Sequence, residues 1–379
     1  MHATHMQVWK YSGTEKIGDS ALERIRIDVQ LHEGQTTTDV LLTGGINGSL
    51  SISEIGKVRQ EFDYGIQCVP NGVWPTIEGN QTECGRAPER IWRDTRASLQ
   101  MSSNISCIKV FRKKLPLPIE DGGGIQHALI STLGSERYGG SLCVLNLSEP
   151  LDFEPAALFI RRRIQEVATF DCTIWTADCG SNDNRAAIGT NLGAALVDVE
   201  TGMTSWVLRS KSDVLALQLV HSLSGNINHS DTIKLPSSIS SLVSLQFDDQ
   251  YFLASSMDGS LKLYDHRLIQ RGPIQSYEGH VNSHTRIQLG VDPLERFVMS
   301  GGDDCYLRLW SIKSGELLFQ EKFSNAVLST VCWRSEGPSV ALSSDQNETN
   351  SVSKYFDEES CGSGAWLSSL EGLFYMQWL

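Results

Sequence analysis

One local pattern recurs along this chain of 379 residues: a run of small side chains, a tight turn, and a strand of alternating character. The clearest copy spans 253–265, with Asp258 in its turn. A second clear copy spans 299–310, and its Asp304 follows Asp258 by 46 residues. Weaker copies lie at 42–52, 187–197 and 367–378, and a fragment lies at 139–145. Repetition at this spacing is typical of arrays in which each copy is one small sheet.

The turns of these copies explain why each copy is expected to form a hairpin. Asp-Gly and Asn-Gly pairs accept the positive φ angles of two-residue hairpin turns, and small residues let neighbouring sheets approach closely. Alternation along 261–263 and 307–309 places the leucines on one face and Lys262 and Arg308 on the other. Such a sheet cannot bury its faces alone, so the copies must stack in a ring. The sequence therefore predicts an all-β fold of the β-propeller class.

The sequence contains about seven predicted blades, each made of an opening strand, a hairpin and a closing strand. The predicted blades span 20–65, 104–160, 170–209, 213–239, 240–278, 279–322 and 326–379. The last of them ends on what should be its third strand, so residues 7–11 are expected to supply the fourth strand and close the ring. On this interpretation residues 1–379 form a single β-propeller domain.

Three stretches depart from the period. Residues 66–103 contain several prolines and glycines, which indicate a loop inserted between blades. Residues 336–363 are rich in Ser, Asn, Asp and Glu, which indicate a mobile polar loop. The fourth predicted blade lacks a hairpin, because only the polar stretch 221–240 follows its first apolar strand, 213–219. This blade is predicted to be truncated, as in a shortened variant of the chain, or else to be short and irregular.

Charge and cysteine content narrow the range of partners. A formal net charge of -13 argues against nonspecific binding to nucleic acid, which depends on clustered Lys and Arg. The nine cysteines are scattered and never form a C-x-x-C pair, so neither a zinc ribbon nor a disulfide framework is expected. There is no apolar run of about 18 residues and no signal-peptide pattern, so we expect no membrane association and a nuclear or cytoplasmic location.

The sequence carries none of the common catalytic motifs, such as a nucleophile elbow, a Walker loop or H-E-x-x-H. The glycine-rich stretch 121–124 has no Lys after it and is expected to be a turn. His221, His229, His280 and His284 have no metal-binding spacing. We therefore expect no catalytic, cofactor-binding or metal-binding residues. The alternative from another class is a propeller hydrolase, which titratable groups with perturbed pKa values at the central channel would favour.

The stretch 279–310 resembles the frame of a WD repeat. Gly279-His280 stands 30 residues ahead of Trp310, similar to the Gly-His and Trp-Asp pairs that bound such repeats. By this resemblance His280, Ser300, Asp304 and Trp310 form a buried, hydrogen-bonded structural tetrad. A satisfied network of this kind holds a strand against its turn.

The stretch 253–267 is similar to the docking box of the WD-repeat substrate receptors of the cullin-4 RING ubiquitin ligase. It ends with Tyr264, Asp265, His266 and Arg267, where Tyr264 replaces the usual Trp. The resemblance implies that Arg267 projects from the blade rim and contacts the adaptor, damaged-DNA-binding protein 1, while Asp265 holds it. A guanidinium suits this role because its planar fork of donors can bridge to oxygens of a partner. The next copy has Ser and Lys in place of Asp and Arg at 310–313, so no second docking box is expected there.

Residues 251–267, 277–282 and 304–310 together make the chain resemble the cullin-4-associated factor 4 family. The resemblance implies a non-catalytic interaction platform without a cofactor. Such a platform docks on the adaptor of the cullin-4 complex and recruits a protein substrate, which the sequence does not identify, for ubiquitination. A WD-repeat scaffold of another complex is the alternative within the same class.

Overall fold

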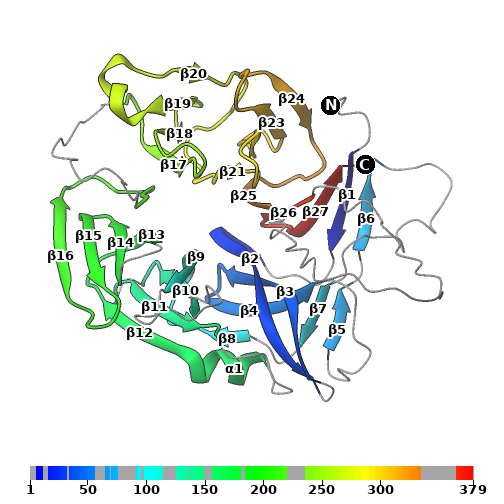
Figure 1. Ribbon diagram of the computed structural model, residues 1–379, viewed down its shortest axis with the longest axis vertical. Coiled ribbons are helices and arrows are strands. Elements are labelled where there is room, and N and C mark those ends of the chain that lie inside the picture. The colour runs from blue at the N-terminus through cyan, green and yellow to red at the C-terminus, as the bar shows by residue number, and fades with distance from the viewer. Residues whose placement is uncertain are drawn as a thin grey trace, which may run out of the picture.

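Six antiparallel β-sheets stand around a common axis in the computed structural model (Figure 1). The structure describes residues 6–11, 16–31, 34–55, 65–68, 70–75, 91–94, 98–113, 125–135, 137–148, 156–180, 184–219, 235–333 and 364–378. The arrangement is a β-propeller, which confirms the predicted all-β class.

The first three sheets, numbered along the chain, come from its N-terminal half. Sheet 1 consists of β2 (Ile17–Leu31), β3 (Gly34–Gly45), β4 (Ser49–Ile55), β7 (Ile91–Asp94) and β5 (Gly65–Cys68), with β8 (Ser98–Gln100) also paired to β4. Sheet 2 consists of β9 (Ile105–Lys113), β10 (Ile125–Thr132), β11 (Ser141–Asn146) and β12 (Ile164–Thr169). Sheet 3 consists of β13 (Ile174–Cys179), β14 (Arg185–Thr190), β15 (Gly193–Asp198) and β16 (Thr204–Arg209).

The other three sheets complete the ring. Sheet 4 consists of β17 (Ile239–Ser244), β18 (Tyr251–Ser256), β19 (Leu261–Asp265) and β20 (Gln275–Ser276). Sheet 5 consists of β21 (Gly290–Val291), β22 (Phe297–Ser300), β23 (Leu307–Ser311) and β24 (Leu317–Glu321). Sheet 6 consists of β25 (Leu328–Trp333), β26 (Gly364–Ser369), β27 (Gly372–Trp378), β1 (Met6–Tyr11) and β6 (Pro70–Trp74). The first strands β2, β9, β13, β17, β21 and β25 lie nearest the axis (Figure 1).

The turn between β18 and β19 shows how the repeated pattern builds a hairpin. Gly259 adopts a φ of 80°, a left-handed conformation that glycine takes without a steric penalty. The carboxylate of Asp258 accepts a hydrogen bond from the backbone N–H of Ser260 at 2.9 Å. In the copy 46 residues later the same position is Cys305, which has a φ of 65° although it carries a side chain.

Sheet 6 joins the two ends of the described chain. β1 pairs antiparallel with β27, from Met6 opposite Trp378 to Tyr11 opposite Leu373. Trp9 and Tyr11 are buried, and the ring of Trp9 stacks on Tyr375. The strand expected at 7–11 therefore lies beside the last strand of the chain and removes an open sheet edge.

The stretch 66–103, expected as an inserted loop, differs from that expectation. Its described residues include β6, which adds to the outer side of β1, and β7 and β8, which pair with β4. The sequence did not reveal these strands because they are short, and their partners lie far from them along the chain. The stretch 336–363, expected as a mobile polar loop, lies outside the described residues.

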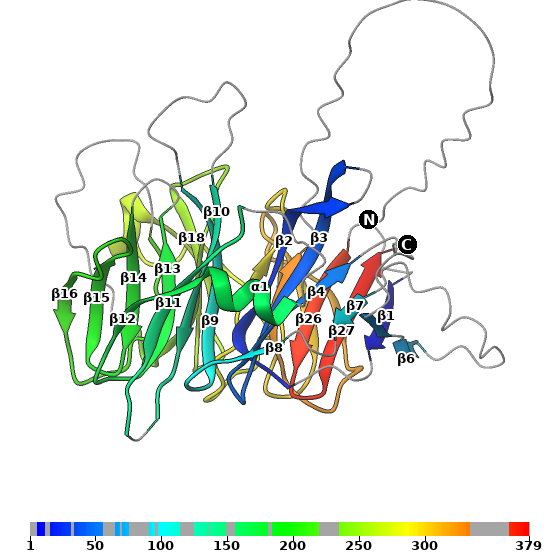
Figure 2. The same cartoon turned by 90° about the horizontal axis from the view of Figure 1, so that it is seen from below.

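Helix α1 (Ala156–Arg163) was not expected. The predicted second blade, 104–160, was expected to consist of strands up to its end. The buried side chains of Phe159 and Ile160 pack into the core cluster of sheets 1, 2 and 6. Figure 2 shows the helix on the outside of the ring, beside β8 and β11. No described helix is long and apolar enough to cross a membrane.

The described residues form six sheets and not the seven predicted blades. Residues 213–219 of the predicted fourth blade belong to no strand, and 220–234 lie outside the described residues. The segment 213–219 nevertheless packs on sheet 3, where the N–H of Val214 donates to the carbonyl of Thr190 at 2.9 Å. Gly189 permits this approach, because a Cβ there would lie 2.4 Å from the carbonyl oxygen of Val214. Among the described residues, the first strand of the predicted fourth blade is thus an extended segment without a hairpin.

The buried apolar side chains form clusters between adjacent sheets. One cluster joins sheets 6, 1 and 2, a second joins sheets 5 and 6, a third joins sheets 2 and 3, and a fourth joins sheets 4 and 5. In the part of the chain that the structure describes, none of these four clusters joins sheet 3 to sheet 4. Among the described residues, apolar clusters therefore join every pair of neighbouring sheets except sheets 3 and 4.

Candidate functional site

The docking box predicted at Tyr264, Asp265 and Arg267 lies where β19 ends. Asp265 is the last residue of β19 and caps the short 3₁₀ helix η2 (His266–Arg271). Its carboxylate accepts the backbone N–H of Arg267 at 2.8 Å, Nε of the same residue at 3.0 Å and Nη2 at 2.7 Å. Because three donors of one residue converge on one carboxylate, the guanidinium is held in a single orientation.

Burial differs sharply between the two partners of this ion pair. The Asp265 side chain is only 3% exposed, whereas the Arg267 side chain is 59% exposed. Hydrogen bonds from Arg267 lower the pKa of Asp265, and the hydrogen bond to Asp265 raises the pKa of Arg267. Asp265 is thus an anchor inside the blade, and Arg267 presents the outer edge of its fork to solvent.

Tyr264 does not lie at the surface, where a residue that contacts a partner would have to be. It is buried, and its ring stacks on Phe252 with 5.3 Å between centroids. Phe252 also contacts the ring of His266, at 4.6 Å between centroids. Tyr264 is therefore linked to His266 of η2 only through Phe252, and its buried ring does not reach the surface that a partner would touch.

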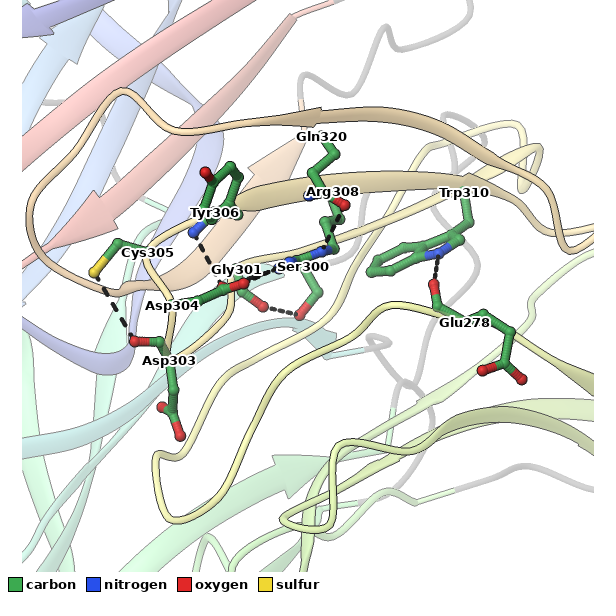
Figure 3. Close-up of polar contacts among 10 residues, drawn as sticks. All are labelled: Glu278, Ser300, Gly301, Asp303, Asp304, Cys305, Tyr306, Arg308, Trp310 and Gln320. Carbon is green, nitrogen blue, oxygen red and sulfur yellow. Dashed lines mark hydrogen bonds and ion pairs between the residues drawn. The ribbon is translucent and has the colours of Figure 1, made fainter.

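The structure brings together part of the tetrad that the WD-repeat resemblance implies. His280 and Ser300 are buried and share a hydrogen bond of 3.2 Å between Nε2 and Oγ. Trp310 is fully buried, with its ring centroid 6.3 Å from that of His280. Its indole N–H donates to the backbone carbonyl of Glu278 at 2.9 Å (Figure 3). Trp310 thus ties β23 to the segment that precedes His280.

Asp304 pairs with Arg308, which the sequence predicts on the strand face opposite Leu307 and Leu309. Arg308 Nη1 donates to the Asp304 carboxylate at 3.0 Å, and Nη2 donates to its other oxygen (Figure 3). The Arg308 side chain is only 4% exposed, and its Nε reaches Gln320 at 3.3 Å. The sequence missed this ion pair, although the spacing of four residues between the two charges was a visible signal.

A second group of ionisable side chains lies on the inner strands. Glu23 on β2 and Lys109 on β9 form an ion pair with 3.6 Å between oxygen and nitrogen. Burial lowers the pKa of Lys109, but Glu23, Cys107, Asp178 and Cys332 together outweigh that effect, so the net shift is upward. Burial raises the pKa of Cys332 to about 12 and also raises that of Cys107. The lysine is therefore fully charged and both thiols are protonated near neutral pH, so this group contains no activated cysteine nucleophile.

The remaining titratable residues do not gather around a metal. Within the described ranges, no three His, Cys, Asp or Glu side chains form a group that could hold a metal ion. Of the four histidines considered as metal ligands from the sequence, His280 is bonded to Ser300, and His284 is exposed beside Asp303. His221 and His229 lie outside the described residues.

Part of this chain is similar to proteins of a known family. Residues 208–353 match the family model of the DDB1- and CUL4-associated factor 4 beta-propeller domain. DDB1- and CUL4-associated factor 4 of Bos taurus and of Homo sapiens are each 40% identical to the chain over 82 residues. DDB1- and CUL4-associated factor 4-like protein 2 of Homo sapiens has the same identity over the same length.

These matches are partial. The aligned 82 residues are 22% of this chain and 16% of the bovine and human relatives. The solved structure of the computationally designed Ika8 protein covers 97% of this chain and is covered over 98% of its own, with a TM-score of 0.48 and 13% identity. That likeness is too low to add to the fold described above. Over residues 208–353, which contain sheets 4 and 5 with Arg267, the chain resembles the WD-repeat propeller of the DDB1- and CUL4-associated factor 4 family.

Proposed function

We propose that this propeller docks on damaged-DNA-binding protein 1 and serves as a substrate receptor of a cullin-4 RING ubiquitin ligase. The observation that carries the proposal is the ion pair of Arg267 with Asp265, which fixes a half-exposed guanidinium at the rim of sheet 4. The residues involved lie within the segment that matches the family model. The relatives are named DDB1- and CUL4-associated factor 4, in which DDB1 stands for damaged-DNA-binding protein 1 and CUL4 for cullin-4.

The geometry of Arg267 suits recognition of oxygen atoms on a protein partner. Nε and Nη2 are occupied by Asp265, and among the described residues Nη1 has no hydrogen-bond acceptor. The free side of the fork can therefore donate to carbonyl or carboxylate oxygens. Because the guanidinium is already ordered, a partner does not have to immobilise it, and less conformational entropy is lost on binding.

In this proposal the protein contributes binding geometry and no chemical step. One face of the ring holds the adaptor, and another face presents a target protein to the ubiquitin-charged enzyme that the cullin holds. The inner strands carry titratable groups with perturbed pKa values, which is the feature expected of a propeller hydrolase, but the thiols of Cys107 and Cys332 are protonated and supply no nucleophile. The match to the family model favours the platform over the hydrolase. A nuclear or cytoplasmic location is part of the same proposal.

We also propose that the chain forms a single propeller domain of seven blades. In this proposal residues 213–239 occupy the place of one truncated blade. Two contacts support this placement between sheets 3 and 4. The N–H of Leu219 donates to the Asp178 carboxylate at 2.7 Å, and the side-chain oxygen of Gln218 accepts the N–H of Ser244 at 2.6 Å. The described part of this segment therefore contacts both sheets that a complete blade would separate.

Capture of purified damaged-DNA-binding protein 1 by Arg267→Ala tests the docking proposal. We expect the dissociation constant to rise about tenfold or more, because truncation of an arginine at an interface hot spot has an effect of this size. Arg271→Ala is the matched control, since Arg271 is exposed on the same 3₁₀ helix and should bind like the parent. Arg271→Ala should keep the thermal transition of the parent. Arg267→Ala should keep a cooperative transition at a lower temperature, because the buried Asp265 carboxylate loses two of its three donors.

Two results would contradict the proposal in different ways. Equal binding by the parent and by Arg267→Ala would remove Arg267 from the docking site. No binding of the adaptor by the parent protein would end the ligase proposal and favour a scaffold of another complex.

A further inference from the structure

A second arginine on sheet 5 is held in the same manner as Arg267. Asp292 follows β21, and its side chain is only 2% exposed, while that of Arg296 is 47% exposed. The carboxylate of Asp292 accepts Nε of Arg296 at 3.1 Å, and it also accepts the backbone N–H groups of Arg296 and Phe297. A buried carboxylate again fixes a half-exposed guanidinium at a turn.

The two arginines lie at the same end of the propeller. In an antiparallel sheet of four strands, the turn after the first strand and the connection after the third strand emerge at one end. Arg296 lies in the turn that follows the first strand of sheet 5, and Arg267 lies in the connection that follows the third strand of sheet 4. Both guanidinium groups therefore face the same side of the ring.

Hydrogen bonds connect the loops that carry them. The Glu295 carboxylate accepts the N–H of Phe247 at 3.1 Å and also the N–H of Gln246, both in the turn between β17 and β18. The carbonyl of Gln250 in that same turn accepts the N–H of His266 at 2.8 Å. The path from Arg296 to Arg267 is thus continuous and runs through a single turn of sheet 4.

Apolar side chains stand exposed on this path. Phe247 is 73% exposed and Leu294 is 58% exposed, although each is a large hydrophobic residue. An exposed aromatic ring on the turn that links the loops of two ordered arginines has the composition of an interface hot spot, where aromatic residues and Arg predominate. Because each arginine is already paired with an aspartate, the surface is not a cationic patch for phosphates. It suits a protein that offers an apolar pocket between oxygen acceptors.

We propose that Phe247 and Arg296 belong with Arg267 to one docking surface, so that the adaptor spans sheets 4 and 5. The proposal rests on the proposed function, since it names damaged-DNA-binding protein 1 as the occupant. It adds two contact residues that lie outside the docking box. Phe247 fills an apolar pocket of the adaptor, and Arg296 donates to oxygens on the far side of that pocket.

Binding of the full chain to immobilised damaged-DNA-binding protein 1 tests this extension. We expect Phe247→Ser and Arg296→Ala each to raise the dissociation constant about tenfold or more, as Arg267→Ala should. Lys313→Ala is the control, because Lys313 is exposed in the connection after β23, on the same side of the ring. It should bind within about twofold of the parent.

The outcomes separate this inference from the proposed function. If Arg267→Ala is impaired while Phe247→Ser and Arg296→Ala bind within about twofold of the parent, the extended surface is wrong and the docking box stands. If the parent does not bind the adaptor, both proposals fall. Should Arg296→Ala lose its cooperative thermal transition, Phe247→Ser decides the matter, because the exposed Phe247 ring contributes little to the fold.

Discussion

Aspartate–arginine pairs recur at the turns of sheets 4 and 5, but burial gives them different roles. Asp265 and Asp292 hold arginines that are about half exposed and free to meet a partner. Asp304 instead holds Arg308, which is buried against Tyr306 and Gln320. A buried arginine that lost its carboxylate would be an uncompensated charge, so this third pair stabilises sheet 5 and binds nothing outside it.

His280 makes the stability of the protein depend on pH. Burial lowers the pKa of His280 below its ordinary value of 6.5, the charge of Arg308 lowers it further, and Gly259, Asp303 and Asp304 raise it. A histidine whose pKa is lower in the folded state favours the unfolded state as the pH falls through 6.5, because the unfolded chain takes up the proton first.

We therefore expect the free energy of unfolding to decrease as the pH is lowered from about 7 to about 5. Chemical denaturation at several pH values measures this dependence. His280→Gln should be less stable than the parent at pH about 7 but should show a flatter pH profile. An unchanged profile in this variant would mean that other groups cause the dependence.

At the scale of the elements, the most consequential strand is β1. It supplies the fourth strand of sheet 6 and places Trp9 and Tyr11 in the core. The neighbouring Lys10 forms an ion pair with Glu371 at 2.8 Å on the opposite face of the strand. Trp9 and Tyr11 are therefore expected to contribute more free energy to the closure of the ring than Lys10 does.

Substitution of Trp9 tests that difference. We expect Trp9→Ala to lower the free energy of unfolding by about 3–5 kcal/mol, because it leaves a cavity beside Tyr375. Lys10→Ala is the control and should cost less than about 1 kcal/mol, because Lys10 and Glu371 are both partly exposed to solvent. Urea denaturation gives both values. A loss of similar size in the two variants would show that β1 does not close the ring through its buried face.

Elements with a strong local signal were the ones that the sequence predicted. The hairpins β18–β19 and β22–β23 follow from their turn residues and from alternation over a few positions. Strand β6 and helix α1 had no such signal, because β6 is defined by its pairing with β1, about 60 residues away along the chain. Helix α1 is held by the burial of Phe159 and Ile160.

At the scale of the whole molecule, the junction between sheets 3 and 4 has the least apolar packing among the described residues. No described apolar cluster crosses it, and the segment 213–219 bridges it by hydrogen bonds. A second tie runs across the axis, where Nη1 of the buried Arg286 donates to the carbonyl of Ser106 on β9 at 3.0 Å. Arg286 precedes β21 of sheet 5, so this bond links opposite sides of the ring.

Loss of the hydrogen bond from Arg286 to Ser106 should make local opening more frequent at the junction between sheets 3 and 4. We expect Arg286→Met to lower the free energy of unfolding by about 2–3 kcal/mol, the usual contribution of a buried hydrogen bond from a charged group. Amide hydrogen exchange should become faster at Val214 and Leu219. Arg185→Met is the control, because Arg185 is exposed on β14. Unchanged exchange in Arg286→Met would show that the junction does not depend on this bond.

The sequence by itself determined the β-propeller class, the hairpins of sheets 4 and 5, and the pairing of Asp265 with Arg267, because each depends on residues close together along the chain. Tertiary structure alone decided the number of described sheets, the burial of Arg308 and the proximity of Phe247 and Arg296 to Arg267. These features depend on contacts between segments far apart along the chain. A local pattern of residues sets the direction of a side chain on its strand, but it does not specify which distant surface that side chain meets.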